Sequence, residues 1–194
     1  KGANGEGYLK DVVAVASGGN HSMALKSDGS VWSFGYNYYG QLGIGTASTD
    51  SGSADYQRIY PVQVRGTGNS GYLSDIVAVD AGDYHSMALK SDGSVWAWGY
   101  NYYGQLGIGT SGSSTDKSAP VQVKGAGGSG YLADEVAISA GDYFGMALKT
   151  DGSVWAWGYN SFGNLGDGTT EQKNYPVQVS FGRSLNLSYA AVID

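Results

Sequence analysis

One motif is written three times along this chain of 194 residues and strongly limits what it can fold into. The copies run from His21 to Thr46, from His85 to Thr110 and from Phe144 to Thr169, and a Pro-Val-Gln-Val tetrapeptide follows each of them. All three prolines, all three methionines and all five tryptophans stand at matching positions of these repeats. The Asp-Gly pairs begin at residues 28, 92 and 151, which are 64 and then 59 residues apart. Self-similarity at such a period is typical of a propeller or a solenoid.

Each repeat reads as four short strands. In the second copy an apolar run at 75–79 is followed by a segment at 85–90, and Ser-Asp-Gly separates that segment from a third at 94–99. Asp-Gly between two β-prone runs predicts a tight hairpin whose two central residues both have positive φ. The fourth strand of the first copy is expected at 60–65. Pro61 near its beginning indicates an edge strand or a strand start, because proline has no N–H to donate.

The third strand of each repeat is apolar on both faces. Trp96 and Trp98 are two residues apart and share one face, while Val95 and Ala97 share the other. A sheet that is apolar on both faces is covered on both sides, as in a propeller blade packed between two neighbours. We therefore expect the tryptophans of the second and third copies to be largely buried, namely Trp96, Trp98, Trp155 and Trp157.

The repeat resembles that of the RCC1 (regulator of chromosome condensation) propeller family. The resemblance rests on His-Ser, the Asp-Gly hairpin, the run VWxWGxNxxGQLGxGT and the closing PVxV, and it extends from about Tyr8 to Val179. It implies a ring of four-stranded blades, usually seven. Members of this family bind proteins for unrelated purposes, including nucleotide exchange on a small GTPase, β-lactamase inhibition and ultraviolet perception, so the fold does not give the function. The style of these Gly- and Tyr-rich repeats is closest to bacterial exported or surface proteins.

The expected fold is thus all-β, with RCC1-like β-propeller blades and the whole chain, 1–194, as one propeller segment. The repeats are placed at approximately 8–65, 72–124 and 131–179, and the tail at 180–194 is a partial fourth repeat or a closing strand. Closed propellers use about four to eight blades, so three repeats do not close a ring. Either the chain is part of a larger propeller, or a second copy closes the ring by strand pairing.

Composition excludes several classes of partner. The chain has 11 basic and 17 acidic residues and a net charge of −6, so no basic run is available to neutralise phosphates. Nucleic acid is therefore a poor partner, and an anionic membrane surface is disfavoured for the same reason. No apolar run approaches the roughly 18 residues that span a bilayer, which argues against membrane insertion. The absence of cysteine excludes disulfides and thiolate sites but leaves the compartment open.

No set of residues points to catalysis, and we expect no cofactor and no metal site. His21 and His85 occupy equivalent positions, and the third repeat has Phe144 there, so a packing role is favoured over a base or a ligand. The aspartates of the Asp-Gly pairs are turn formers. Two histidines without cysteine make no recognisable zinc site. The Gly-rich loops lack the Lys-Ser/Thr of a phosphate cradle, and their asparagines are expected to satisfy local backbone groups.

Two features are candidates for binding a partner. The first is the series of aromatic residues beside the Gly-rich loops, since tyrosine offers large contact area and a polar tip. We expect the first ring of each group, as at Tyr36, to pack between blades and the later two to be available. The second is the loop before each tetrapeptide, because variable loops in a constant repeat often carry recognition. The interval from its Thr to the Pro of the tetrapeptide shortens from 15 to 10 to 7 positions. The candidate residues are Tyr38, Tyr39, Tyr102, Tyr103, Phe162, Asp50, Asp55, Tyr56 and Arg58.

These observations favour a non-enzymatic protein-binding or scaffold module, extracellular or at the cell surface of a bacterium. Its expected partner is another protein, and a second copy of the chain is one candidate. Two alternatives stay open. A glycan-binding module would also use exposed aromatic rings with scattered Asp and Asn, and a purely structural spacer of a long surface protein would need neither.

Overall fold

The computed structural model describes residues 7–180, and this part of the chain is built from β-strands. The twelve strands are β1 (Val12–Ser17), β2 (His21–Lys26), β3 (Val31–Tyr36), β4 (Gln57–Gln63), β5 (Ile76–Ala81), β6 (His85–Lys90), β7 (Val95–Gly99), β8 (Lys117–Gln122), β9 (Glu135–Ala140), β10 (Phe144–Lys149), β11 (Val154–Gly158) and β12 (Lys173–Gln178). Two short 3₁₀ turns, η2 (Thr67–Asn69) and η3 (Ala126–Gly128), lie in the connections between sheets.

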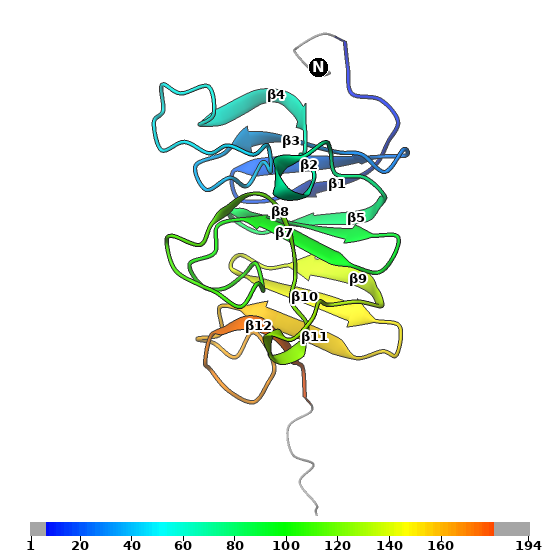
Figure 1. Cartoon of the computed structure of the whole chain (residues 1–194), viewed down its shortest axis with the longest axis vertical. Helices are drawn as coiled ribbons and strands as arrows, with labels where there is room; N and C mark the ends of the chain where they lie inside the picture. Colours follow the sequence, from blue (N-terminus) through cyan, green and yellow to red (C-terminus); the bar gives the residue numbers. More distant parts are fainter. Residues whose placement is uncertain (1–6, 181–194) are drawn as a thin grey trace, which may run out of the picture.

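The strands form three antiparallel sheets of four, each made of consecutive strands. We call β1–β4 blade 1, β5–β8 blade 2 and β9–β12 blade 3. The blades are stacked face to face, with blade 2 between the other two (Figure 1). This confirms the expected all-β fold of propeller blades. The tail expected to begin a fourth repeat or to close a ring lies, from residue 181 on, outside the described residues.

The Asp-Gly hairpin differs from the expected two-residue turn. Between β2 and β3, Gly29 has a φ of 76°, whereas Asp28 is not among the described residues with positive φ. The Gly29 N–H donates to the Lys26 carbonyl at 2.9 Å, so residues 26–29 form a four-residue turn whose last residue, Gly29, is in the left-handed region. The Asp28 carboxylate accepts from the Ser30 N–H at 3.0 Å. The prediction of two positive φ angles was therefore wrong, because the loop is longer than the dipeptide alone indicates.

The proline of each tetrapeptide lies inside its strand and not at its beginning. β4 begins at Gln57, four residues before Pro61, and β8 and β12 also begin before their prolines. The expectation of an edge strand holds, since β4, β8 and β12 each pair with one neighbour only. The pairing register between β3 and β4 shifts between Ser33 and Gly35. A proline is tolerated at such an irregular place on an edge because no partner requires its missing N–H.

The core lies between the blades. Met23, Leu25 and Val31 of blade 1 meet Ala88 and Trp98 of blade 2 in one buried cluster. The second cluster repeats this pattern between blades 2 and 3 and contains Met87, Leu89, Val95, Ala147 and Trp157 among others. Each blade thus covers one face of the next, as the apolar pattern predicts.

Burial of the tryptophans follows their place along the strand. Trp98 and Trp157 are fully buried, and their indole N–H groups donate to the Gln41 and Gln105 carbonyls of the preceding blade, each at 2.9 Å. Trp96 and Trp155, expected to be largely buried, are only half-buried. They lie near the Asp-Gly turns, where their N–H groups donate to Ser94 and Ser153.

Candidate functional site

Tyrosines gather at one end of the strands. The loops that join β1 to β2 and β3 to β4, with their counterparts in blades 2 and 3, all lie at this end, on the left of the stack in Figure 1. We call it the tyrosine end, and we call the opposite end, which carries the Asp-Gly turns, the turn end. Because equivalent loops of successive blades lie side by side, rings far apart in the sequence come into contact, such as Tyr39 with Tyr100 and Tyr84 with Tyr143.

The rings at this end touch one another in an unbroken series across all three blades. Their centroids lie between 4.5 Å (Tyr39 and Tyr100) and 6.4 Å (Tyr84 and Tyr143), and several pairs meet edge to face. We call this series the tyrosine strip. It consists of Tyr36, Tyr38, Tyr39, Tyr56, Tyr84, Tyr100, Tyr102, Tyr103, Tyr143, Tyr159 and Phe162.

The third ring of the first two loops bridges two blades. Tyr39 of blade 1 lies 5.3 Å from Tyr84 and 4.5 Å from Tyr100 of blade 2. Tyr103 repeats this contact with blade 3, at 5.4 Å from Tyr143. The first rings pack between blades as expected, since Tyr36 lies 6.4 Å from Tyr84 and Tyr100 lies 6.4 Å from Tyr143. Tyr39 and Tyr103 pack there as well, which was not expected. The loops turn back after the first ring, which brings the third ring to the neighbouring blade.

Buried asparagines hold these loops in shape. The Asn37 amide donates to the Thr46 and Asp55 carbonyls, both at 2.9 Å, and its oxygen accepts from the Leu42 N–H at 3.1 Å. The Gln41 side-chain oxygen accepts from the Tyr39 N–H at 3.0 Å. Asn101 and Asn160 occupy the same place in blades 2 and 3 and make equivalent bonds. The expected role of these asparagines in satisfying local backbone groups is confirmed. Their hydrogen bonds fix the loops that carry the tyrosine strip.

The electrostatics of the strip disfavour added negative charge. Burial raises the pKa of Tyr100 to about 12, and the neighbouring tyrosines and Asp116 add to this effect. Burial also raises the pKa of Tyr143 to about 12, supported by a hydrogen bond to the Asp83 carboxylate. The phenols of Tyr100 and Tyr143 are therefore neutral at physiological pH, and their hydroxyl groups can donate hydrogen bonds.

The other candidate residues lie in the loop between β3 and β4. Tyr56 joins the strip through an edge-to-face contact with Tyr36, at 5.1 Å. Arg58 and Asp55 form an ion pair at 2.6 Å beside it. These residues border a hollow of about 760 Å³ that Tyr36, Tyr56, Arg58 and Tyr84 help to line. Asp50 is exposed, and its carboxylate accepts from the Gly52 N–H at 2.9 Å, so its observed contacts are those of a turn residue.

Two exposed rings stand out among the predicted binding residues. Tyr102 is 48% exposed and Phe162 is 86% exposed. Sequence reasoning did not select Tyr84 and Tyr143, although both occur in a repeated Gly-Asp-Tyr before the second strand. That repetition was the available signal, and the structure places both rings at the centre of the strip.

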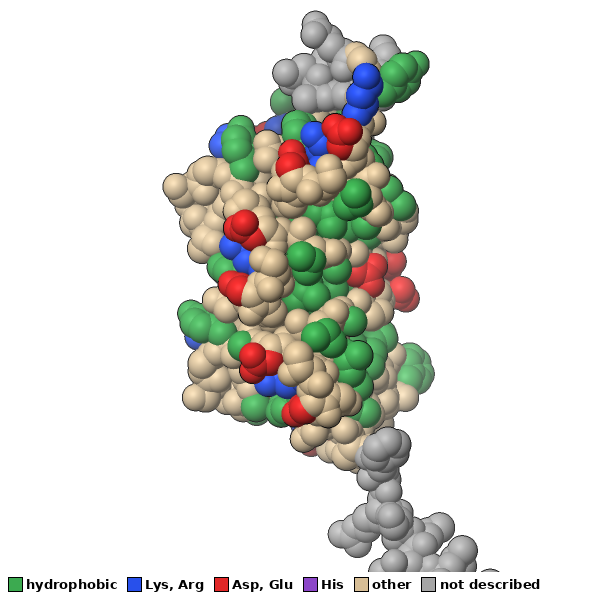
Figure 2. Space-filling view, turned by 90° about the vertical axis from the view of Figure 1, so that its right-hand side faces the viewer, with side chains coloured by type: hydrophobic (Ala, Val, Ile, Leu, Met, Phe, Trp, Pro, Cys, Tyr) green, Lys and Arg blue, Asp and Glu red, His purple; other side chains and the backbone are tan. Residues whose placement is uncertain are grey.

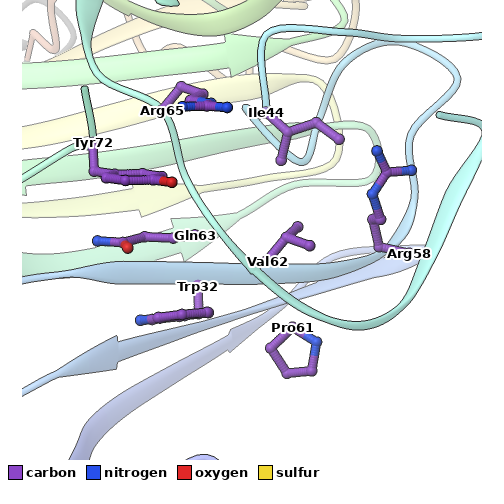
Figure 3. Close-up of a pocket in the computed structure, with 8 residues that line it drawn as sticks. All are labelled: Trp32, Ile44, Arg58, Pro61, Val62, Gln63, Arg65 and Tyr72. Carbon is purple, nitrogen blue, oxygen red and sulfur yellow. The ribbon is translucent and has the colours of Figure 1, made fainter. Parts of the chain in front are cut away.

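A second hollow lies outside the strip, on blade 1. It measures about 330 Å³ and is lined by Trp32, Gln63, Arg65 and Tyr72, among others. Figure 3 shows Arg65, Tyr72, Gln63 and Trp32 in successive layers, and the Arg65 guanidinium lies 5.1 Å from the Tyr72 ring centre. The molecule's own cation thus already covers this aromatic face.

The histidines have the buried, neutral character of packing residues. His21 Nε2 lies 2.8 Å from Ser86 Oγ of the next blade, and burial lowers the pKa of His21 to about 4. His85 is fully buried, and burial lowers its pKa to about 3. Within residues 7–180, no group of three or more His, Asp or Glu side chains is arranged to hold a metal ion. The same residues include no helix with the length and apolarity needed to cross a bilayer.

Comparison with known proteins gives the chain's relatives. It is 33% identical over 172 residues to a bifunctional serine/threonine-protein kinase/NEDD4-like E3 ubiquitin-protein ligase of Dictyostelium discoideum, over 85% of this chain and 8% of the relative. It is 32% identical over 167 residues to the ultraviolet-B receptor UVR8 of Arabidopsis thaliana, over 86% of this chain and 34% of the receptor. The chain therefore spans a third or less of the length of these two relatives.

Structure comparison and family profiles agree with these relatives. The fold matches Prp20p of Saccharomyces cerevisiae, a protein studied for its binding to Gsp1p and histones, with a TM-score of 0.71 and 22% identity over 91% of this chain and 40% of Prp20p. Two sequence profiles described as the regulator of chromosome condensation (RCC1) repeat match this chain three times each, one at 12–41, 76–105 and 136–164, the other at 28–89, 92–148 and 151–192. The chain belongs to the RCC1 repeat family.

Proposed function

We propose that this chain is a non-enzymatic protein-binding module and that the tyrosine strip is its binding surface. The observation that carries the proposal is the unbroken series of rings that crosses all three blades at one end of the strands. Tyrosines are enriched where proteins bind because they present large, rigid, partly polar area at low entropic cost. RCC1 repeats are found in proteins that bind other proteins, as Prp20p does, which supports the proposal without naming a partner.

The geometry favours a protein partner over the alternatives. A purely structural spacer does not require eleven neighbouring rings at one end of the molecule, two of them strongly exposed. A glycan platform typically combines flat exposed rings with paired polar groups, whereas most rings here are tilted against one another and half-buried. An uneven surface that combines aromatic rings with polar hydroxyl groups suits the side chains of another protein.

Selection of peptides tests this proposal directly. A phage-displayed library of random peptides is selected on the immobilised chain, and the affinity of individual peptides is then measured by fluorescence polarisation. We expect Tyr102→Ser with Phe162→Ser, which removes two exposed strip rings, to weaken the selected peptides by roughly tenfold or more. The control is Tyr72→Ser with Tyr131→Ser, which removes two rings of similar exposure, 53% and 55%, outside the strip and should leave affinity unchanged.

Two outcomes contradict the proposal. One is a set of selected peptides whose affinity is insensitive to the strip variant. The other is strip-dependent binding of oligosaccharides without any strip-dependent peptide, which identifies a glycan-binding module.

A bacterial source and an extracellular or cell-surface location complete the proposal. They rest on the style of the Gly- and Tyr-rich repeats, whereas the relatives described above come from Dictyostelium, Arabidopsis and yeast. Fractionation of the source cells with an antibody to the chain tests them, and recovery from the cytoplasmic fraction alone would contradict them.

A further inference from the structure

The two ends of the strands differ in charge. The loops and first strand residues at the tyrosine end carry seven carboxylates and three basic side chains. These are Asp50, Asp55, Asp83, Asp116, Asp142, Asp167 and Glu171 against Arg58, Lys117 and Lys173. The turn end, with the connections from β4 to β5 and from β8 to β9, is close to balanced, with Asp11, Asp28, Asp75, Asp92, Asp134, Asp151 and the buried Glu135 against Lys10, Lys26, Arg65, Lys90, Lys124 and Lys149. The acidic excess of the described chain therefore lies mainly beside the tyrosine strip.

The few cations at the tyrosine end are already engaged. Arg58 pairs with Asp55 at 2.6 Å, and Lys173 lies 3.2 Å from Glu171 and 3.6 Å from Asp167. Lys117 follows Asp116 directly and attracts its carboxylate. By contrast, no ion pair within residues 7–180 involves Asp83 or Asp142, which flank the central rings Tyr84 and Tyr143. Among the described residues, therefore, no cation pairs with either of these two carboxylates.

The same contrast holds for the aromatic faces. Outside the strip, Arg65 covers Tyr72 at 5.1 Å and Lys124 covers Tyr131 at 4.7 Å. Lys90 and Lys149 lie over Trp96 and Trp155. Among the described residues no such contact involves a ring of the strip. Figure 2 looks onto the turn end and shows its acidic and basic side chains in neighbouring clusters, so that end neutralises itself.

We propose that the tyrosine strip receives an extended, basic segment of a partner protein, whose arginine and lysine side chains lie over the exposed rings and beside Asp83 and Asp142. Aromatic faces and carboxylates attract cations together, because the ring quadrupole and the negative charge act in the same direction. The strip runs over three blades, so its length suits an extended segment better than one isolated side chain. This inference rests on the proposed function and adds the chemistry of the partner.

Matched peptides test the charge requirement. Three labelled peptides of equal length repeat Gly-Ser-X, with X as Arg, Gln or Glu, and their binding to the full chain is measured by fluorescence polarisation at low and at high salt. We expect the Arg peptide to bind at least about tenfold more tightly than the Gln peptide and the Glu peptide not to bind. Equal binding of the Arg and Gln peptides would overturn the inference.

Charge variants separate local recognition from the overall negative charge. Asp83→Asn with Asp142→Asn should weaken the Arg peptide by roughly tenfold. The matched control, Asp75→Asn with Asp134→Asn, removes the same charge at the turn end and should change its affinity less than about twofold. Both control residues have positive φ, 63° and 68°, which asparagine tolerates. An equal loss in the two double variants would show unspecific attraction and overturn the inference.

The phage selection distinguishes this inference from the proposed function. Strip-dependent peptides enriched in Arg and Lys support both. Strip-dependent peptides of neutral composition leave the proposed function in place and overturn the basic-segment inference. An absence of strip-dependent peptides overturns both.

Discussion

The junction between blades 1 and 2 and the junction between blades 2 and 3 are built from the same repeat, but two residue differences leave the side chains of His85 and Glu135 without hydrogen-bond partners at the second junction. At the first junction, His21 meets Ser86 at 2.8 Å, and the Ser86 hydroxyl donates to the Gln41 carbonyl at 2.8 Å. At the second, His85 faces the position of Gly145, and neither ring nitrogen of His85 has a hydrogen-bond partner. The Ser86 hydroxyl therefore gives His21 Nε2 a partner that His85 Nε2 lacks, while Nδ1 is unpaired in both histidines.

The second difference lies at the start of the first strand of each following blade. Ile76 begins β5 and is part of the apolar cluster between blades 1 and 2. Glu135 begins β9 at the equivalent place, is 4% exposed, and has no hydrogen-bond partner on either carboxylate oxygen. A buried polar group without a partner costs about 1–3 kcal/mol. The comparison teaches that near-identical repeats do not give equally stable junctions, and that the second junction is the weaker.

Removal of the buried tryptophans has the largest expected effect and tests what the two junctions share. Trp98→Ala and Trp157→Ala should each lower the free energy of unfolding by about 3–5 kcal/mol, because a large ring leaves a cavity and a carbonyl of the preceding blade loses its donor. Urea unfolding followed by circular dichroism measures both. A loss below about 1 kcal/mol in either variant would show that the core is not between the blades.

The pH dependence of the free energy of unfolding should reveal the burial of Glu135. Burial raises the pKa of Glu135 to about 7, above its ordinary 4.5, while Lys149 opposes this shift and Asp134 and Asp151 add to it. The folded chain thus holds this proton more tightly than the unfolded chain does. The contribution of Glu135 to the free energy of unfolding is therefore complete below pH 4.5. Roughly 2 kcal/mol of it is lost as the pH rises to about 7.

The difference between wild type and Glu135→Gln isolates this effect from that of His85. Burial lowers the pKa of His85 to about 3, below its ordinary 6.5, so its contribution falls as pH drops below 6.5 and has the opposite sign. Both proteins contain His85, and its contribution cancels in the difference. A difference in unfolding free energy that stays constant between pH 4.5 and pH 7 would contradict the assigned burial of Glu135.

The matched histidine variants have the smallest expected effect and compare the junctions most closely. His85→Phe should raise the unfolding free energy by about 1 kcal/mol, because it removes two unpaired nitrogens and places the ring that blade 3 already has at Phe144. His21→Phe should lower it by about 1 kcal/mol through loss of the bond to Ser86. Thermal and urea unfolding measure both variants, and shifts of the same sign would show that the two histidines are equivalent after all.

The repeat made most of the fold predictable from the sequence. Three copies of one pattern predict three copies of one sheet, and the replacement of His85 by Phe144 within the same chain correctly indicates packing. The conformation of the Asp-Gly turn and the mid-strand position of Pro61 were harder to predict. The φ of Asp28 depends on the length of the whole loop, and Pro61 is tolerated in mid-strand because of an irregular pairing that local sequence does not encode.

The candidate surface was predictable in composition but not in geometry. The aromatic series beside the Gly-rich loops indicated the right region, and the structure brings Tyr38, Tyr39, Tyr102, Tyr103, Tyr56 and Phe162 into one strip. The first rings bridge the blades as predicted, but the contacts of Tyr39 and Tyr103 with the next blade depend on the path of the loop, which the sequence pattern does not give. The binding role of these residues and of Asp50, Asp55 and Arg58 stays a prediction.

Hydrogen–deuterium exchange on the full chain, with and without a saturating peptide from the phage selection, tests the central claim that the tyrosine strip binds protein. We predict slower exchange in the loops at 82–84, 100–105 and 141–143, which carry the central rings of the strip, and no change at the Asp-Gly turns at 26–30, 90–94 and 149–153. Protection confined to the Asp-Gly turns, with unchanged exchange in the tyrosine loops, would contradict the account.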